Sequence, residues 1–214
     1  MRLYITQKSY FFVHKHFISF FKKDKVKILY VTENTRGITK KYFEIIKNFG
    51  IVNTFICSCL EIIYFLKFFK IESRLNKVTI KDSDLNFYLD NEISNNDYQE
   101  IISIGCPCKI DPSLKEKYSI KIVNLHGGII PYQKGRFSPI KSLKKGHKYL
   151  GASIYEITDE FDEGDVLSQD YFEVSSSNKI YNYSKVLSLS AGILNAYLAK
   201  EHKLIPNNIL KSLI

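Results

Sequence analysis

The chain has no tryptophan, a single methionine and only five prolines among its 214 residues. Lysine, isoleucine, asparagine, tyrosine and phenylalanine are abundant instead, a bias that we attribute to the source genome rather than to function. No repeat, linker or low-complexity stretch divides the sequence. One domain with a sizeable core is the simplest organisation at this length, so we expect a single domain over residues 1–214 with a short tail at 203–214.

The chain also lacks a long uncharged apolar run. The apolar stretch at residues 11–21 is short and interrupted by charge, and the one at 60–69 contains Glu61 and Lys67. Both are shorter than the roughly 20 residues that a helix needs to cross a bilayer. We therefore expect no targeting or spanning segment, no membrane partner and a cytoplasmic location.

Cysteine is scarce, and its spacing leaves two interpretations open. The four residues form two Cys-x-Cys pairs, Cys57 with Cys59 and Cys106 with Cys108. Four thiolates could bind zinc, but structural zinc ligands are usually separated by at least two residues. Buried free thiols in a reducing compartment are the interpretation that we favour, and we expect no metal.

Positive charge exceeds negative charge, with 31 Lys and Arg against 22 Asp and Glu and a formal net charge of +9. Such an excess favours an anionic partner, such as nucleic acid, an acidic membrane face or a phosphorylated substrate. A solvated lysine-rich surface is the alternative. Because the lysines are scattered and no nucleic-acid motif accompanies them, we do not expect a nucleic-acid partner.

Apolar runs and turn residues alternate in the way that is typical of an α/β fold. This alternation through about residue 125 predicts a Rossmann-like, doubly wound, mostly parallel sheet, which an antiparallel pair then extends. The predicted strands are 1–6, 26–32, 52–57, 77–80, 100–104 and 120–124, followed by the pair 151–157 and 166–174. The predicted helices are 10–21, 39–49, a buried helix at 60–69, then 87–93, 112–118, 140–145 and 179–202.

A polar motif, Asn124-Leu125-His126, ends the strand predicted at 120–124. Residues two apart on a strand point to the same face, so the amide and the imidazole project together where open α/β sheets bind ligands. The segment 159–165, Asp-Glu-Phe-Asp-Glu-Gly-Asp, can bring a carboxylate to them. Asn, His and Asp together suit proton transfer and stabilisation of an oxyanion, as acyl transfer requires.

Each group in this constellation also has a plainer interpretation. A histidine after an apolar strand is often a structural hydrogen-bonding group, and an acidic loop is often simply solvated. Gly127 and Gly128 favour a ligand site at His126, because glycine lets the backbone approach a ligand closely.

The same stretch resembles the 10-formyltetrahydrofolate-dependent formyltransferases, with which it shares an ordered series of motifs: Asn124-x-His126, Pro131, Gly135-Arg136 and Asp162-x-Gly164. The strong part of the resemblance covers about residues 98–170. The chain departs from the family where Gly127 replaces a proline of some members and where Lys134-Gly135 replaces the commoner Arg-Gly. The resemblance implies the formyltransferase fold and formyl transfer from 10-formyltetrahydrofolate to an amine, without metal.

The resemblance also implies residue roles. His126 would stabilise the tetrahedral oxyanion, Asn124 would bind the formyl group, and Asp162 would hold His126 and accept a proton. The register relative to Gly164 selects Asp162 among the loop's acids. The expected folate-binding residues are Cys106, Pro107, Cys108, Ile110, Thr158 and Glu160, and the expected substrate-binding residues are Lys8, Tyr10, Phe11, Lys134 and Arg136.

The acceptor is the least specified part of this prediction. The segment after the first strand does not contain the Gly-rich phosphate loop that glycinamide ribonucleotide transformylases carry there. The methionyl-tRNA and amino-sugar branches of the family have an aromatic residue at about the position of Phe11, and the chain resembles them in this respect. The transfer-RNA enzymes carry a second, C-terminal domain, whereas this sequence ends soon after His202. We therefore expect the acceptor to be a nucleotide-linked amino sugar, such as dTDP-4-amino-4,6-dideoxyglucose. Its product would serve surface polysaccharide such as lipopolysaccharide O-antigen. The resemblance also implies that the protein is a homodimer. The alternatives are methionyl-tRNA, another small amine such as hydroxyornithine, and a non-catalytic folate-binding relative.

Overall fold

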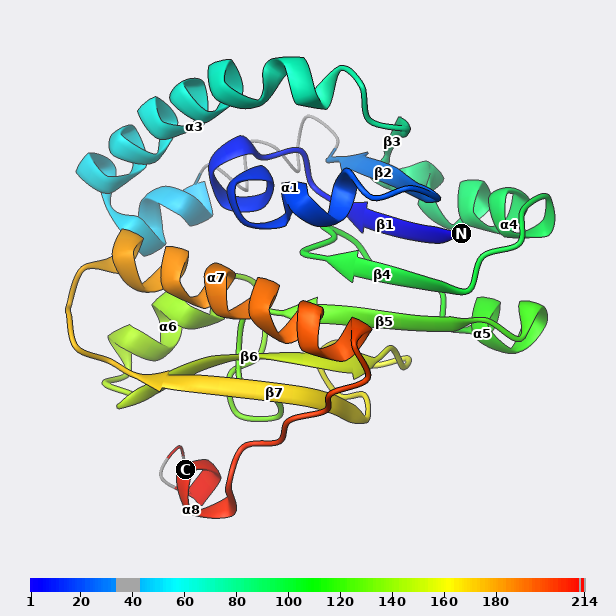
Figure 1. The fold of residues 1–214 in the computed structure, drawn as a ribbon. Helices are drawn as coiled ribbons and strands as arrows, with labels where there is room; N and C mark the ends of the chain where they lie inside the picture. The colour runs from blue at the N-terminus through cyan, green and yellow to red at the C-terminus, as the bar shows by residue number, and fades with distance from the viewer. Residues whose placement is uncertain (34–42, 212, 214) are drawn as a thin grey trace. The chain divides into compact units, whose positions relative to one another are not determined.

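The computed structural model describes residues 1–33, 43–211 and 213, and the side chains of Tyr10 and Phe11 lie outside this description (Figure 1). The strands are β1 (Arg2–Thr6), β2 (Val26–Thr32), β3 (Lys77–Lys81), β4 (Glu100–Ile104), β5 (Lys121–His126), β6 (Tyr149–Glu156) and β7 (Val166–Glu173). The helices are η1 (Tyr10–His14), α1 (Lys15–Phe21), α3 (Ile51–Glu72), η2 (Asp82–Asp84), α4 (Leu85–Ser94), α5 (Ser113–Tyr118), α6 (Ser138–Lys144), α7 (Lys179–Leu198) and α8 (Asn207–Lys211).

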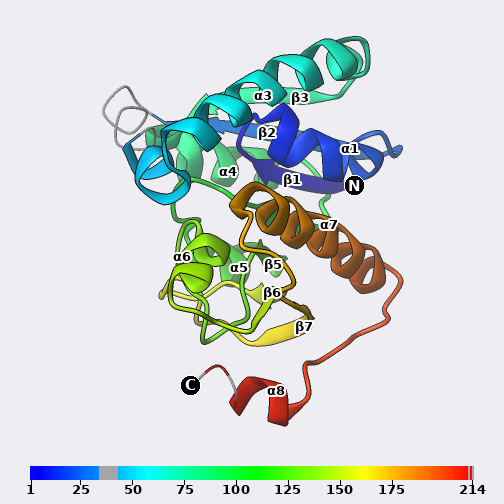
Figure 2. The same ribbon diagram turned by 90° about the vertical axis from the view of Figure 1, so that its left-hand side faces the viewer.

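The strands form one seven-stranded sheet in the order β3-β2-β1-β4-β5-β6-β7. β1 runs parallel to β2 and β4, and β2 runs parallel to β3. Strands covered on both faces read as continuous apolar runs, and Leu3, Tyr4 and Ile5 of β1 are at most 1% exposed. Figure 2 shows α1 and α4 on opposite sides of β1 and β2. The predicted doubly wound sheet is confirmed.

The antiparallel extension is the hairpin of β6 and β7, which pairs Tyr149 with Glu173 at one end. Its register is irregular between Ile154 and Tyr155. A Cβ atom on Gly151 would lie 2.3 Å from the carbonyl oxygen of Asp170, so this strand pair depends on a glycine at position 151. The predicted antiparallel pair is confirmed.

The chain divides into two compact units, which are described separately. Unit 1 comprises Met1–Glu44 and Ile56–Asn124, and its core contains apolar side chains of β1, β2 and β4. Unit 2 comprises Ile45–Phe55 and Leu125–Ile214, with α7 packed on β6 and β7. The single domain expected over the whole chain stays a prediction.

Two expectations about the region after residue 50 were wrong. Residues 52–57 are helical rather than a strand, and the helix predicted at 60–69 is exposed rather than buried. Short apolar runs do not distinguish helix from strand, and no glycine or proline separates the two runs, so they join into α3. The joined helix is long and apolar enough to cross a membrane by length and composition, contrary to our length argument.

Other differences are small. The segment predicted as one helix at 10–21 begins as the π-helical turn η1 before α1. Of the helix predicted at 39–49, residues 43–49 are helical, and 39–42 lie outside the described residues. The expected tail at 203–214 contains α8 and contributes Ile205 and Leu213 to an apolar cluster with Ile129 in unit 2.

Candidate active site

β5 ends in the polar motif that the sequence singled out. Asn124 and His126 are half-buried, whereas Val123 and Leu125 are buried. This alternation is the consequence of strand geometry, in which successive side chains point to opposite faces. The amide and the imidazole therefore lie on the face of β5 that leaves some of their surface accessible.

The imidazole of His126 is held at one nitrogen by the backbone. Its Nε2 atom lies 2.7 Å from the carbonyl oxygen of Gln133. Because a carbonyl only accepts hydrogen bonds, Nε2 carries a proton in this arrangement. The Ser138 hydroxyl lies 3.3 Å from the same nitrogen and donates to the carbonyl oxygen of Gly127. The ring is thus fixed against the turn that follows β5.

Gly128 makes this arrangement sterically possible. A Cβ atom at position 128 would lie 2.1 Å from the Gln133 carbonyl oxygen, 2.7 Å from His126 Nε2 and 2.8 Å from Ser138 Oγ. All three distances are shorter than a carbon atom tolerates. The second glycine of the motif therefore permits the hydrogen bond between His126 and Gln133, which is a physical reason for its position in the sequence.

The buried side chain of Gln133 holds the residue in place through hydrogen bonds to the backbone. Its Oε1 accepts from the N–H of Ile129 at 3.2 Å, and its Nε2 donates to the carbonyl oxygen of Tyr149 at 2.8 Å. The residue is 2% exposed. These bonds close the turn at 129–133, which contains the cis peptide bond between Ile130 and Pro131. Sequence reasoning missed Gln133, because nothing in its local pattern distinguishes it from a polar loop residue.

The same turn is tied to the hairpin by a second buried network. Ser153 on β6 donates to the carbonyl oxygen of Gly128 at 2.7 Å and accepts from the N–H of Ile130 at 3.1 Å. Gln169 on β7 donates to Ser153 and to the carbonyl oxygen of Ile130. Satisfied buried networks of this kind rigidify a structure, so the backbone around His126 is held from two directions.

Asp162 approaches the other nitrogen of the ring. Its Oδ1 atom lies 3.4 Å from Nδ1 of His126. Oδ1 also accepts from the Tyr155 hydroxyl at 2.8 Å, and Oδ2 accepts from the N–H of Gly135 at 2.6 Å. A buried carboxylate needs such partners to offset its lost hydration. Tyr155 is the second residue that the sequence did not reveal.

Burial separates Asp162 from the other acids of its loop. It is 6% exposed, whereas its four acidic neighbours are exposed: Asp159, Glu160, Glu163 and Asp165. The solvated-loop interpretation therefore applies to those four and not to Asp162. Gly164 accounts for the position of Asp162 two residues before it, because a Cβ atom at position 164 would lie 1.7 Å from the carbonyl oxygen of Glu156. The chain must pass directly against β6 just after Asp162, which itself has a positive φ of 58°.

His126 and Asp162 are arranged in a way that suits proton transfer. The ring of His126 faces an acceptor at each nitrogen, a carbonyl oxygen at Nε2 and a carboxylate at Nδ1. Both side chains are largely buried, with 11% and 8% of their surface exposed. An imidazole and a carboxylate held this closely by fixed donors and acceptors can move a proton between a bound group and the protein.

The residues expected to bind folate fall into two groups in different units. Cys106, Pro107 and Cys108 follow β4 in unit 1 and are half-buried, and Ile110 is buried. Thr158 and Glu160 belong to unit 2 and are exposed, and the Thr158 hydroxyl donates to the Glu160 carbonyl oxygen. The structure does not test a shared pocket, so this assignment stays a prediction.

The four cysteines are free thiols. The Sγ atoms of Cys106 and Cys108 lie 3.9 Å apart. Their shared hydrogen bond raises the pKa of the Cys106 thiol and lowers the pKa of Cys108. Within the described part of the chain, no group of three or more His, Cys, Asp and Glu side chains could hold a metal ion.

Among the residues expected to bind the acceptor, the two lysines pair with carboxylates in the structure. Lys134 Nζ lies 2.6 Å from Glu163 Oε1, and Lys8 Nζ lies 3.6 Å from Glu72 Oε1. Arg136 is half-buried just before α6. Tyr10 and Phe11 begin η1, and their side chains lie outside the described part. The substrate role of these five residues stays a prediction.

Residues 89–191, which include β5, the 129–133 turn and the Asp162 loop, match the sequence profile of a family described as formyl transferase. A dTDP-4-amino-4,6-dideoxyglucose formyltransferase from Mycobacterium bovis is 32% identical over 72 residues, 34% of this chain and 30% of that protein. A methionyl-tRNA formyltransferase from Hydrogenobaculum sp. is 32% identical over 92 residues, 43% of this chain and 29% of that protein. The matched stretches thus span less than a third of these relatives.

The fold agrees with this family over nearly the whole chain. A phosphoribosylglycinamide formyltransferase from Campylobacter jejuni superposes with a TM-score of 0.61 and covers 94% of this chain and 96% of its own. The sequences are 19% identical, so this likeness concerns the fold alone. The ordered motifs, the sheet and the match over residues 89–191 all agree, so this part of the chain is similar to the formyl transferase family.

Proposed function

We propose that this protein is an N-formyltransferase that moves a formyl group from 10-formyltetrahydrofolate to the amine of a nucleotide-linked amino sugar. A dTDP-4-amino-4,6-dideoxyhexose is the acceptor that we favour. The observation that carries the formyl-transfer part is the buried pair of His126 and Asp162, 3.4 Å apart, beside Asn124 on the same strand. The sugar part rests on the resemblance to the mycobacterial relative over 72 residues.

In this proposal, the neutral amine of the acceptor attacks the formyl carbon and forms the new C–N bond. Asn124 donates a hydrogen bond to the oxyanion, and the Nε2–H of His126, which donates to the Gln133 carbonyl in the structure, is shared with it. Each such donor typically contributes about 3 to 4 kcal/mol of transition-state stabilisation. Asp162 takes the proton that the amine loses, through His126 or directly. The bond from the formyl carbon to the folate nitrogen then breaks, and that nitrogen gains a proton. The fixed partners of His126 and Asp162 reduce the reorganisation that this charge separation requires.

The proposed location is the cytoplasm, with a product that would enter surface polysaccharide such as lipopolysaccharide O-antigen. The homodimer expected from the family is part of the proposal. The folate-lining roles of Cys106, Pro107, Cys108, Ile110, Thr158 and Glu160 also belong to it, together with the acceptor roles of Lys8, Tyr10, Phe11, Lys134 and Arg136.

Methionyl-tRNA is a second candidate acceptor, because a methionyl-tRNA formyltransferase is equally identical over a longer stretch of 92 residues. The net charge of +9 also suits a polyanionic acceptor. Activity on transfer RNA would fall steeply with added salt, since phosphate contacts release counterions.

The test is a mass-spectrometric assay of the purified protein with 10-formyltetrahydrofolate and, in parallel, a panel of nucleoside-diphosphate amino sugars and methionyl-tRNA. A sugar product heavier by one formyl group supports the proposal. His126→Ala should abolish turnover while folate still binds, and His202→Ala, at an exposed histidine just before the tail, is the matched control. A product on methionyl-tRNA alone would overturn the sugar assignment, and full activity in His126→Ala would overturn the site.

A further inference from the structure

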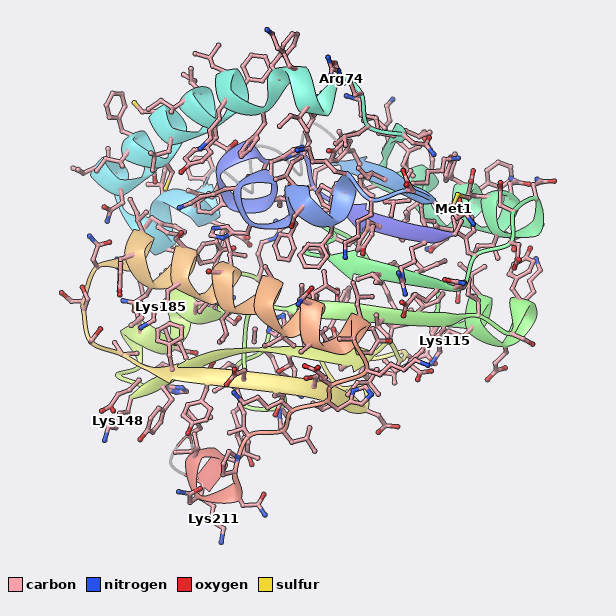
Figure 3. All side chains as sticks on the ribbon, viewed as in Figure 1. Met1, Arg74, Lys115, Lys148, Lys185 and Lys211 are labelled. Atoms are coloured by element: carbon pink, nitrogen blue, oxygen red, sulfur yellow. The ribbon has the colours of Figure 1, made fainter. Side chains whose placement is uncertain are left out.

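Helix α3 presents an unusual face to the solvent. Within unit 1, six large apolar side chains along the helix are between 36% and 71% exposed: Ile56, Ile62, Ile63, Phe65, Leu66 and Phe69. We name these residues the apolar face of α3. Only 11% of the most apolar 18-residue window of α3 is buried, and Figure 3 shows side chains projecting outward along the helix. Contiguous exposed apolar surface of this kind marks an interaction site.

The acidic residues of α3 point the other way. Glu61 accepts a hydrogen bond from the Ser9 hydroxyl at 2.5 Å. Glu72 is 5% exposed and pairs with Lys77 at 2.5 Å and Lys8 at 3.6 Å. These are the two acids of the helix, and partners from unit 1 engage both. The helix therefore turns its carboxylates inward and its isoleucines and phenylalanines outward, the reverse of a surface helix that only covers a core.

The exposed side of the helix carries cations. Lys67 and Lys70 are exposed in its last turns, and the exposed Arg74, labelled in Figure 3, follows its end. No carboxylate of α3 lies among them. The outer side of α3 thus combines large exposed apolar side chains with positive charge, and the whole chain has a net charge of +9. This combination is complementary to a lipid surface that has acidic headgroups.

We propose that α3 binds an anionic membrane surface, with its apolar face at the level of the headgroups and Lys67, Lys70 and Arg74 against lipid phosphates. The helix lies on the surface and does not span it. Spanning would require Glu61 and Glu72 to leave their partners and enter hydrocarbon, where charges are costly. With 22 residues, α3 extends for about 33 Å along such a surface.

The test is co-sedimentation of the full chain with vesicles of phosphatidylcholine alone and with added phosphatidylglycerol. We expect binding that requires the anionic lipid and weakens with salt. Leu66→Glu, at a side chain 71% exposed, should lower the vesicle partition coefficient about tenfold or more, because it places a charge in the contact. Lys67→Gln with Lys70→Gln should weaken binding mainly at low salt.

Phe87→Glu is the matched control, because Phe87 is 77% exposed on α4 and the substitution adds the same charge. It should leave vesicle binding unchanged. Equal losses in Leu66→Glu and Phe87→Glu would overturn the assignment to α3. No binding of the unmodified protein to acidic vesicles would overturn the membrane partner. A dimer that Leu66→Glu dissociates, without any vesicle binding, would assign the face to a second copy of the chain.

Discussion

Replacing Tyr155 by phenylalanine tests whether the buried partners of Asp162 hold the candidate site together. The substitution removes one hydroxyl from a residue that is 3% exposed and leaves its ring in place. The hydroxyl donates to Asp162 Oδ1 at 2.8 Å, the oxygen that also faces His126. A hydrogen bond to a charged group contributes about 1.5 to 3 kcal/mol. We expect Tyr155→Phe to lower the free energy of unfolding by this amount.

The measurement is urea unfolding at neutral pH, compared with Tyr171→Phe. Tyr171 is half-buried on β7 and makes a ring contact with Tyr149, so the control removes the same atom without removing a bond to Asp162. A double-mutant cycle of Tyr155→Phe and Asp162→Asn isolates the coupling between the two side chains. Formyl transfer by Tyr155→Phe should also fall by roughly tenfold, since about 1.4 kcal/mol of lost positioning corresponds to that factor.

The reasoning would be refuted by a Tyr155→Phe protein whose stability matches that of Tyr171→Phe to within about 0.5 kcal/mol. A coupling energy near zero in the cycle would also contradict it, because the bond would then contribute nothing beyond the separate side chains.

The other predictions concern two glycines and a histidine. Gly128→Ala should abolish activity and destabilise the turn, because its Cβ would lie 2.1 Å from the Gln133 carbonyl oxygen; Gly192→Ala on α7, where nothing lies within 4 Å, should instead stabilise by about 0.5 to 1 kcal/mol in thermal unfolding. Burial and, to a lesser degree, Lys15 lower the pKa of His16 to about 4. Because the unfolded chain protonates first, stability present above about pH 6.5 should fall progressively toward pH 4, by up to about 3 kcal/mol. Urea unfolding across this range should show a shallower loss in His16→Gln, and an unchanged slope would contradict the prediction.

Much of the fold could be read from local pattern. The strands β2, β4 and β5 follow directly from short apolar runs bounded by turn residues, and the β6–β7 hairpin follows from two segments in which apolar and polar residues alternate. These elements are specified by residues close to one another in the chain. The motif residues Asn124 and His126 could be assigned to a strand end for the same reason.

Helix α3 shows where local pattern fails. Its apolar residues predicted a strand and a buried helix, because hydrophobic residues are usually inside. The structure joins them into one helix, and burial of Cys57, Phe68 and Glu72 leaves the more apolar side exposed. Which side of a helix is covered depends on the partners available, here Ser9, Lys8 and Lys77, and no window of sequence around α3 contains all of them.

The acidic loop at 159–165 shows most clearly what the sequence determined and what only the tertiary structure decided. By itself, the sequence determined that a carboxylate-rich loop ending near Gly164 follows the Asn124-x-His126 strand, and resemblance selected Asp162 among five acids. Only the tertiary structure decided that Asp162 is the buried one and that Tyr155, Gly135 and His126 surround it. The reason is that burial and hydrogen bonding join groups 7 to 36 positions apart, through close backbone approaches at Gly128 and Gly164 that no local pattern encodes.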